Sequence, residues 1–442
     1  MPATAAISGF SSAAFEAFLQ SRGEPEWLVD MRRAAWKEFE SLPTPSRGDE
    51  EWMRTELRMF HLDRFQIPMA IRGDESAAVP AAVPDALLTH GVEPAGATVV
   101  RDGRPIAASL DPQLAKRGVL FGSLDALVAE HGDLIRRHLF RAMNPSYDKF
   151  AALHAACWTG GTLLYVPRGV VVDRPFHTLS GLSARGVDLG HILVILEPGA
   201  EATLLSETAG GSNTEAAMHC GGIELLVGEN ATLRYVNLQN WGHGVWHFAH
   251  QKGLVNRDGR LQWTIGALGS RLAKVNQHVA LVGPGAQTQV NGVMFTEGKQ
   301  HLTYNTLQHH AAPHCKSDLL YKGGLQDQSR LVWRGMIKVD PIAQQTDGYQ
   351  RNDNLMLSEE SRADSIPGLE IQADDVRCTH GSTTGRVDDE QIFYCQARGL
   401  TRKEAIRTVV AGFFQQVFDR ITIESVREAL GQAIDRRVRE YE

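Results

Sequence analysis

The chain has 442 residues, of which 43% are hydrophobic and 22% are charged, and its formal net charge is -7. This length is too great for one ordinary core and favours about three domains. The acidic balance argues against a nucleic-acid partner, which usually leaves a basic footprint, and no apolar run approaches the roughly 20 residues that span a membrane.

The N-terminal segment and the cysteines bear on where the protein works. No Lys or Arg precedes Arg22, and the segment before it has no continuous apolar core, so it is a poor secretory or transit signal. The cysteines are odd in number and form no C-x-x-C pair: Cys157, Cys220, Cys315, Cys378 and Cys395. Free thiols in a reducing compartment are the simplest interpretation, and we expect a cytoplasmic protein.

The N-terminal part of the chain is predicted to be helical in several places. A proline suits the first turn of a helix at 25–39, where apolar residues recur at helical spacing. A second amphipathic segment opens at 50–57, and a serine could cap a helix over 123–139. Residues 150–158 predict one more short helix. Residues 66–117 are rich in Ala and Pro and are assigned no element.

The periodicity changes from helical to alternating at Gly160 and Gly161 and stays alternating for about two hundred residues. A sequence pattern repeats in this region: a short apolar run predicts a strand, a turn follows, and a second apolar run predicts the next strand. Each copy of this pattern is called a phrase. The first four copies recur about every 26 to 31 residues, a period typical of solenoid coils. With a fifth, looser copy, the phrases cover residues 192–205, 223–235, 254–265, 279–290 and 319–333.

These phrases predict coils stacked into a parallel β-helix, each burying the apolar face of its neighbour. A Greek-key sandwich stays open on strand spacing alone. The ends of a coil stack expose unpaired backbone groups, and we expect the helical segments at both ends of the chain to cap them. A flat lateral strand face would then serve for side-by-side dimerisation. The expected division is 1–155, helical or mixed; 156–385, the β-helix; and 386–442, helical.

A candidate metal site lies at the end of the alternating region. The strand at 369–373 is followed by the acidic pair Asp374 and Asp375, after which the alternation resumes. Cys378 and His380 then lie two residues apart, so both side chains project from one face of an extended chain. A thiolate beside an imidazole suits iron, zinc or copper. The alternative is a small buried cysteine next to a hydrogen-bonded histidine.

Helices are predicted again after this segment. Acidic residues at 388–390 suit a helix start, Gly399 suits a stop, and Thr401 with Glu404 forms a capping box. The apolar stripe that follows is wide enough to receive a partner protein. An intramolecular pairing with the helix at 426–434 is the alternative. The candidate docking residues are Ala405, Ile406, Val409, Val410 and Phe413.

A second possible ligand cluster combines His309, His310, His314 and Cys315 within seven residues. Imidazole and thiolate are natural ligands, but the spacing matches no standard zinc finger. Pro313 restrains the backbone of the residue before it, so a turn of structural histidines is the alternative.

The remaining candidates are interpreted as structural. His243, His247 and His250 are too dispersed around Trp246 to predict a metal site, and the cysteines at 157, 220 and 395 are expected to pack in apolar surroundings. No phosphate-binding loop, G-x-S-x-G elbow or H-E-x-x-H motif occurs, so we expect the chain not to hydrolyse ATP and find no motif of a hydrolase.

Several stretches together resemble the SufB/SufD family of the SUF iron–sulfur cluster assembly machinery, and within it the SufD type. Residues 373–394 read A-D-D-V-R-C-T-H-G-S-T-T-G-R-V-D-D-E-Q-I-F-Y. Residues 158–170 (W-T-G-G-T-L-L-Y-V-P-R-G-V) and 310–323 (H-A-A-P-H-C-K-S-D-L-L-Y-K-G) agree as well. The likeness runs in order over nearly the whole chain and is weakest around 66–117. A SufB-like scaffold is the alternative, but SufB chains are expected to read more like E-H-E-A-T-T-S where this chain has C-T-H-G-S-T-T-G.

The resemblance implies a fold, partners and a site. The fold would be a right-handed parallel β-helix between helical N- and C-terminal domains. The partners would be SufB, paired through the β-helix, and two copies of the SufC ATPase, docked on the C-terminal helices; a homodimer is expected when the chain is alone. Cluster chemistry would occur at the SufB–SufD interface at His380, and Cys378 would match a nearby cysteine of the family. The cluster or iron would be transient. A reduced flavin is also associated with the family's complex, although no flavin-binding pattern occurs here.

Two alternative functions are compatible with the same predicted fold. A β-helix carbohydrate lyase or hydrolase would use carboxylates such as Asp374 and Asp375 along one face. With an aromatic content of 7% and no evident ladder of sugar-stacking rings, the sequence gives this reading little support. A plain interaction scaffold would keep Cys378 and His380 as structural residues only.

Overall fold

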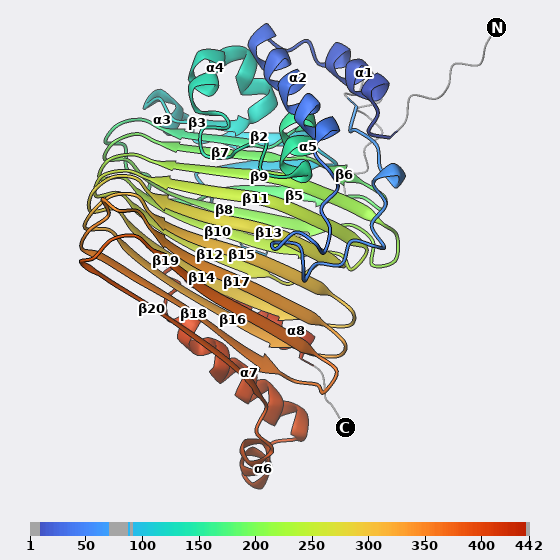
Figure 1. Ribbon diagram of the computed structural model, residues 1–442, viewed down its shortest axis with the longest axis vertical. Helices are drawn as coiled ribbons and strands as arrows, with labels where there is room; N and C mark the ends of the chain where they lie inside the picture. The colour runs from blue at the N-terminus through green and yellow to red at the C-terminus, as the bar shows by residue number, and fades with distance from the viewer. Residues whose placement is uncertain (1–8, 70–86, 89–91, 439–442) are drawn as a thin grey trace, which may run out of the picture.

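Two ten-stranded sheets run side by side in the computed structural model, which describes residues 9–69, 87–88 and 92–438 (Figure 1). The chain passes from one sheet to the other at each turn, so that successive strands of a sheet are parallel and in register. This arrangement confirms the predicted parallel β-helix. It excludes the Greek-key sandwich, whose strands are antiparallel.

The strands of each sheet follow one another along the stack. In order from its N-terminal end, sheet 1 contains β2 (Arg104–Leu110), β1 (Gly96–Arg101), β5 (Phe176–Leu182), β8 (Glu201–Gly210), β10 (Thr232–Trp241), β12 (Arg260–Ala267), β14 (Gln287–Thr296), β16 (Lys316–Leu325), β18 (Thr346–Met356) and β20 (Val376–Arg386). In the same direction, sheet 2 contains β3 (Leu120–Ser123), β4 (Thr162–Val166), β7 (His191–Leu196), β9 (Ala217–Val227), β11 (Val245–Val255), β13 (Leu272–Leu281), β15 (His301–His310), β17 (Arg330–Val339) and β19 (Arg362–Ile371), while β6 (Val187–Asp188) pairs with β9. Only the pairs β1–β2 and β3–β4 within these described strands are antiparallel.

One corner of the stack repeats the same backbone geometry from coil to coil. The corner residue has a positive φ, and its N–H donates to the carbonyl of the next corner, as from Asn230 to Arg257 (2.9 Å) and from Gly285 to Pro313 (3.2 Å). Glycine and asparagine tolerate this left-handed conformation best. The corner residues are Gly199, Asn230, Asp258, Gly285, His314 and Gln345. The predicted fifth copy at 319–333 is therefore wrong in its position. It joins β16 to β17 across the opposite corner, whereas the first four copies cross the corner described here. The equivalent fifth copy joins β15 to β16 through His314.

The interior of the stack is an apolar column. Inward-facing leucines and valines alternate with large rings, including Tyr235, Trp263, Tyr304, Tyr321 and Trp333, all of which are buried. Tyr235 and Trp263 meet edge to face with ring centroids 5.6 Å apart. Each coil thus buries the apolar side chains of its neighbours, which is how a solenoid gains stability.

The N-terminal region supplies helices as well as the first strands. The helices are α1 (Ser12–Arg22), α2 (Glu26–Ser41), the 3-10 helix η1 (Leu62–Arg64), α3 (Pro112–Lys116), α4 (Leu124–His138) and α5 (Lys149–Cys157). Strands β1 to β3 extend the two sheets, while α4 and α5 pack at this end of the stack (Figure 1).

The predicted N-terminal helices are mostly present. The helix expected at 25–39 is confirmed as α2, and those at 123–139 and 150–158 as α4 and α5. Ser123 precedes α4 but makes no capping hydrogen bond. The helix expected at 50–57 is wrong: these residues form turns, and Trp52 packs against Phe150 and Phe248. Parts of 66–117 lie outside the described residues, and the rest includes β1, β2 and α3.

The chain ends in three helices, of which α7 and α8 lie against one side of the stack while α6 packs on α7. They are α6 (Asp389–Ala397), α7 (Arg402–Phe418) and α8 (Glu424–Arg437), and the capping box of Thr401 and Glu404 is confirmed at the start of α7. Helices α7 and α8 cover the outer face of sheet 1, where Phe414 and Leu430 join a core with Val293 and Phe295. The expectation that these helices cap the end of the stack is therefore wrong, since their apolar faces match the side of the sheet (Figure 1). No helix among the described residues is long and apolar enough to cross a membrane.

Candidate functional site

The last coil of the stack, formed by β19, the corner at 372–375 and β20, is called here the terminal coil. Both strands are the final members of their sheets. Ile337 in β17 is fully buried, but its neighbour in register, Leu369 in β19, is 38% exposed, and Ile371 is 41% exposed. Inward-facing positions that are covered elsewhere in the stack are thus open to solvent at this end.

Cys378 and His380 lie on the inward-facing side of the terminal coil. Cys378 is in register with Gly348 and His380 with Gln350, and both of these partners are buried. The two side chains therefore share one face, as the alternation of the sequence predicts. His380 is exposed and Cys378 is half-buried, so both can be reached from outside the chain.

The thiol of Cys378 is held in its protonated form. Burial is the largest cause that raises its pKa, and the nearby charge of Asp347 acts in the same direction, while a hydrogen bond from the backbone of Gly348 opposes them. A thiol with a raised pKa is a poor nucleophile, and it binds a metal only when the metal displaces the proton. Among the described residues, no group of three or more His, Cys, Asp or Glu side chains could hold a metal ion. Cys378 and His380 can therefore form only part of a metal site.

The structure does not bring the cluster of His309, His310, His314 and Cys315 together around one point. His309 pairs with Asp340 (2.9 Å), and His310 contacts the hydroxyl of Ser317 (2.7 Å). His314 is the left-handed corner residue of its coil, with φ of 61°.

Cys315 repeats a packing position of the earlier coils. It follows the corner residue and is fully buried, as are the alanines at the same place in other coils, Ala200, Ala231 and Ala286. Its Sγ contacts the carbonyl of Gly283 (3.3 Å), and burial raises the pKa of its thiol. The geometry therefore supports the alternative interpretation, in which these histidines and Cys315 are structural residues of a turn.

The other predicted histidines are engaged at separate places. His247 meets His219 inside the stack, with the two Nδ1 atoms 2.8 Å apart, whereas His250 pairs with Asp148 on the outer face of sheet 2 (3.1 Å). His243 lies near a carboxylate oxygen of Glu297 (3.4 Å) beside the C-terminal helices. Their dispersal agrees with the structural interpretation.

The carboxylates considered for carbohydrate chemistry belong to the last corner. Asp374 and Asp375 are both exposed, and the carbonyl of Asp375 accepts the N–H of Gln345 while its own N–H donates to the side chain of Gln344 (2.9 Å). The pair thus continues the corner pattern of the stack, and the two residues do not face each other across a cleft.

The remaining cysteines differ in burial. Cys157 and Cys220 are fully buried, and burial raises the pKa of both thiols, as expected of packing residues. Cys395, on α6, is only half-buried, so its expected burial is wrong in part. All five cysteines are free.

The apolar stripe of α7 is used within the chain. Ala405, Ile406 and Val410 are buried against sheet 1 and α8, and Val409 and Phe413 are partly covered. The apolar surface left open in this region is on α6, where Phe393 is 72% and Tyr394 60% exposed. These two residues were missed from the sequence; their signal is an aromatic pair placed between the two helix boundaries at 388–390 and Gly399.

Sequence comparisons identify families and individual proteins that are similar to this chain. Residues 179–413 match the family described as "SUF system FeS cluster assembly, SufBD core domain", and residues 16–177 match "SufBD protein N-terminal region". An iron–sulfur cluster assembly SufBD family protein of Staphylococcus haemolyticus is 25% identical over 408 residues, covering 91% of this chain and 87% of that protein. A protein of the same description from Staphylococcus aureus is 24% identical over 410 residues, covering 91% and 88%.

Proposed function

We propose, from the premise that this chain belongs to the SufBD family of iron–sulfur cluster assembly proteins, that it acts as the SufD-type subunit of an assembly complex. It would perform no ATP hydrolysis and would join a SufB homologue and a SufC ATPase in the cytoplasm. The observation that carries this proposal is the terminal coil, which leaves an imidazole and a thiol at an uncovered end of the stack.

The terminal coil supports pairing with another chain. As edge strands, β19 and β20 carry backbone N–H and C=O groups without a neighbouring strand among the described residues. Such an edge accepts strands of a partner, and Leu369 and Ile371 add exposed apolar surface beside it. A SufB homologue, which shares the fold, would extend both sheets across the join. A second copy of this chain would compete for the same edge when SufB is absent.

The donors at this end fit iron as a transient substrate. His380 offers a neutral imidazole nitrogen in its deprotonated form, and Cys378 offers a soft sulfur once its proton has left. An iron–sulfur cluster as a whole is commonly held by four protein ligands, so two donors here require others from the partner. The proposed site is therefore shared, with this chain holding iron at His380 while the partner supplies further ligands.

The C-terminal helices support a link between an ATPase and the stack. Phe393 and Tyr394 on α6 form an exposed aromatic surface, and Arg398 lies over the ring of Tyr394 (5.1 Å). Aromatic residues of this kind are typical anchors of protein interfaces. We therefore place the ATPase contact on α6 rather than on the buried stripe of α7.

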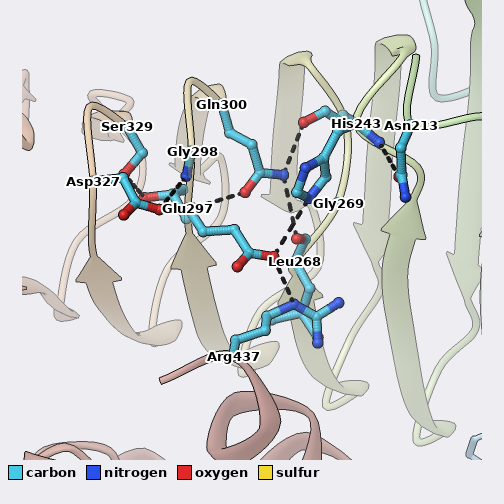
Figure 2. A network of polar contacts seen from close by, with 12 residues as sticks. Asn213, His243, Leu268, Gly269, Glu297, Gly298, Gln300, Asp327, Ser329 and Arg437 are labelled. Atoms are coloured by element: carbon cyan, nitrogen blue, oxygen red, sulfur yellow. Dashed lines mark hydrogen bonds and ion pairs between the residues drawn. The ribbon is translucent and has the colours of Figure 1, made fainter. Parts of the chain in front are cut away.

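Movement of these helices would reach the stack through a polar network at the end of α8 (Figure 2). Glu297, at the end of β14, lies between His243 and Arg437, and Arg437 also donates to the side-chain oxygen of Asn240 (2.7 Å). Gln326 donates to the backbone carbonyl of Arg437 (2.8 Å). The helix end is thus tied to three coils, those of β10, β14 and β16.

The test is co-expression of this chain with SufB and SufC homologues, followed by measurement of stoichiometry, bound iron and cluster yield. His380→Ala is expected to leave the stoichiometry unchanged and to lower the cluster yield about tenfold or more, the scale seen when metal-site residues are removed. His61→Ala is the matched control, because His61 is an exposed histidine in the N-terminal region. Unchanged yield in His380→Ala would remove this residue from the site.

A second pair of variants tests the docking surface. Phe393→Ala with Tyr394→Ala is expected to release the ATPase while the SufB homologue stays bound. Retention of the ATPase by this double variant would move the contact elsewhere on the chain.

A further inference from the structure

A groove on the outer face of sheet 2 extends to β19 of the terminal coil but does not include Cys378 or His380. Strands β11, β13, β15 and β17 form its floor, and the loop between α4 and α5 forms one wall with Met143, Asn144 and Tyr147. Glu51 closes the wall from the turn region near residue 50. The volume is about 480 Å³, which is within the range of small-molecule sites.

Two asparagines at the floor of the groove carry side-chain atoms without partners. Asn276 and Asn305 are neighbours in register and are 2% and 6% exposed. Oδ1 of Asn276 and Nδ2 of Asn305 are buried and make no hydrogen bond. A buried polar atom without a partner is costly, typically about 1 to 3 kcal/mol. The pair therefore leaves one acceptor and one donor at the floor of the groove that no described residue satisfies.

A hydrogen-bonded chain orients the first of these amides. Nε2 of His250 faces Oδ1 of Asp148 at 3.1 Å, so this nitrogen carries a proton, and the other ring nitrogen, Nδ1, faces Asn276. Nδ2 of Asn276 lies 3.4 Å from that Nδ1. The carboxamide of Asn276 is thus held with its donor toward His250 and its acceptor free.

Lys252 supplies a cation at the same floor. It has no ion pair or hydrogen bond among the described residues, although burial lowers its pKa and the charge of Glu224 acts against that shift. The carboxylates around the groove are engaged elsewhere: Glu51 accepts from Tyr147 (2.6 Å), and Glu370 pairs with Lys338 (3.2 Å). Glu224 accepts three backbone N–H groups of the wall loop. Lys252 is therefore a cationic side chain at the floor that has no ion-pair partner among the described residues.

The spacing of these groups suits one small ligand. Lys252 lies two residues beyond His250 on β11, and His250 pairs in register with Asn276, so the backbone of Lys252 stands roughly 7 Å along the strand direction from the amide pair. Tyr147 contacts the rings of His250 and His278 at one side, with centroids 5.3 and 5.8 Å away. Met143, Leu307 and Met336 add apolar surface among the polar and charged side chains that line the rest. A bare ion would leave both this apolar surface and the amides unused.

We propose that the groove binds a small organic anion. Its phosphate or carboxylate group would contact Lys252, and an edge with one hydrogen-bond donor and one acceptor would contact Asn276 and Asn305. This site does not depend on the proposed role of the terminal coil. Glu370, which lines the groove, belongs to β19 of the terminal coil, but neither Cys378 nor His380 lines it.

Calorimetric titration of the full-length chain with adenosine monophosphate, citrate and inorganic phosphate tests the proposal. We expect saturable binding of adenosine monophosphate or of citrate, and the arm that binds identifies the phosphate ester or the polycarboxylate as the source of the anion. Lys252→Met should weaken this binding roughly 10- to 100-fold, since it removes a charge-assisted hydrogen bond, and Asn305→Ala roughly three- to tenfold. Lys299→Met, at an exposed turn outside the groove, is the matched control and should bind as the parent does.

Three results would overturn the proposal. The first is the absence of saturable binding of both organic anions at millimolar concentration. The second is binding that Lys252→Met leaves unchanged in a chain whose unfolding transition matches the parent. The third is inorganic phosphate binding as tightly as the organic anions, because the amide pair would then contribute nothing.

Discussion

The two ends of the coil stack are finished in different ways. At the N-terminal end, antiparallel β2 and β3 complete the sheets, and helices α4 and α5 bury apolar residues against the first coils. At the other end, the C-terminal helices pass along the side of sheet 1 and leave the terminal coil uncovered. Among the described residues, the N-terminal end of the stack is therefore covered, whereas the C-terminal end is not. The open end is the one that carries His380, which is why we assign it to a partner.

The largest expected effect comes from breaking the closed end at Arg32. This guanidinium is fully buried, pairs with Glu24 (2.6 Å), donates to the carbonyls of Ala156 and Trp158, and lies over the Trp158 ring (4.4 Å). Arg32→Met would leave these acceptors unpaired, and we expect a loss of about 3 to 5 kcal/mol in unfolding free energy. Urea unfolding measures it.

The control for this variant is Arg33→Met. Arg33 is exposed and pairs with Glu16 at the surface (3.1 Å), so its loss should not shift the transition measurably. Equal effects of the two substitutions would mean that the closed end is not held by the buried arginine.

A matched pair of core substitutions compares the closed stack with the terminal coil. Ile337 and Leu369 are in register, but the first is fully buried and the second is 38% exposed. Ile337→Ala should cost about 2 to 5 kcal/mol, while Leu369→Ala should cost less than about 1 kcal/mol in the isolated chain. In the complex, Leu369→Ala should weaken association instead. An equally large loss of stability from Leu369→Ala alone would show that this end is already covered.

The smallest effect is the contribution of one buried histidine, His247 in β11, to the pH dependence of stability. Burial lowers the pKa of His247 to about 3, so the folded chain keeps this ring neutral where the unfolded chain, with an ordinary value near 6.5, takes up a proton. Stability is therefore lost as the pH falls from about 6.5 toward 3. His247→Gln should reduce the slope by up to about 1.4 kcal/mol per pH unit, measured by urea unfolding between pH 7 and 5. An unchanged slope would contradict the assigned neutral state.

Much of the stack could be predicted from the sequence because its repeats are local. The change of periodicity at Gly160, the turns of the first four copies and the capping box at Thr401 each follow from spacing and residue type alone. The shared face of Cys378 and His380 also follows, since a strand alternates its side chains.

What the sequence could not predict depends on contacts between distant segments. The apolar stripe of α7 reads the same whether it covers a partner or sheet 1, and only the packing of Phe414 against Phe295 decides. The corner role of His314 was hidden because a histidine stands where the first four copies have glycine, asparagine or aspartate. The groove at Asn276 joins strands to a loop more than a hundred residues earlier, and no local pattern marks it.

The corner hydrogen bonds have a direction that bears on how the protein is made. Each corner N–H donates to the carbonyl of a coil that comes later in the chain, from Gly199 onward to Asp375. During synthesis, the corner N–H of a folded coil is thus available to the carbonyl of the coil that is made next. The stack can therefore fold from its N-terminal end one coil at a time. The surface that we assign to the partner is completed late, after the earlier coils have had time to form behind it.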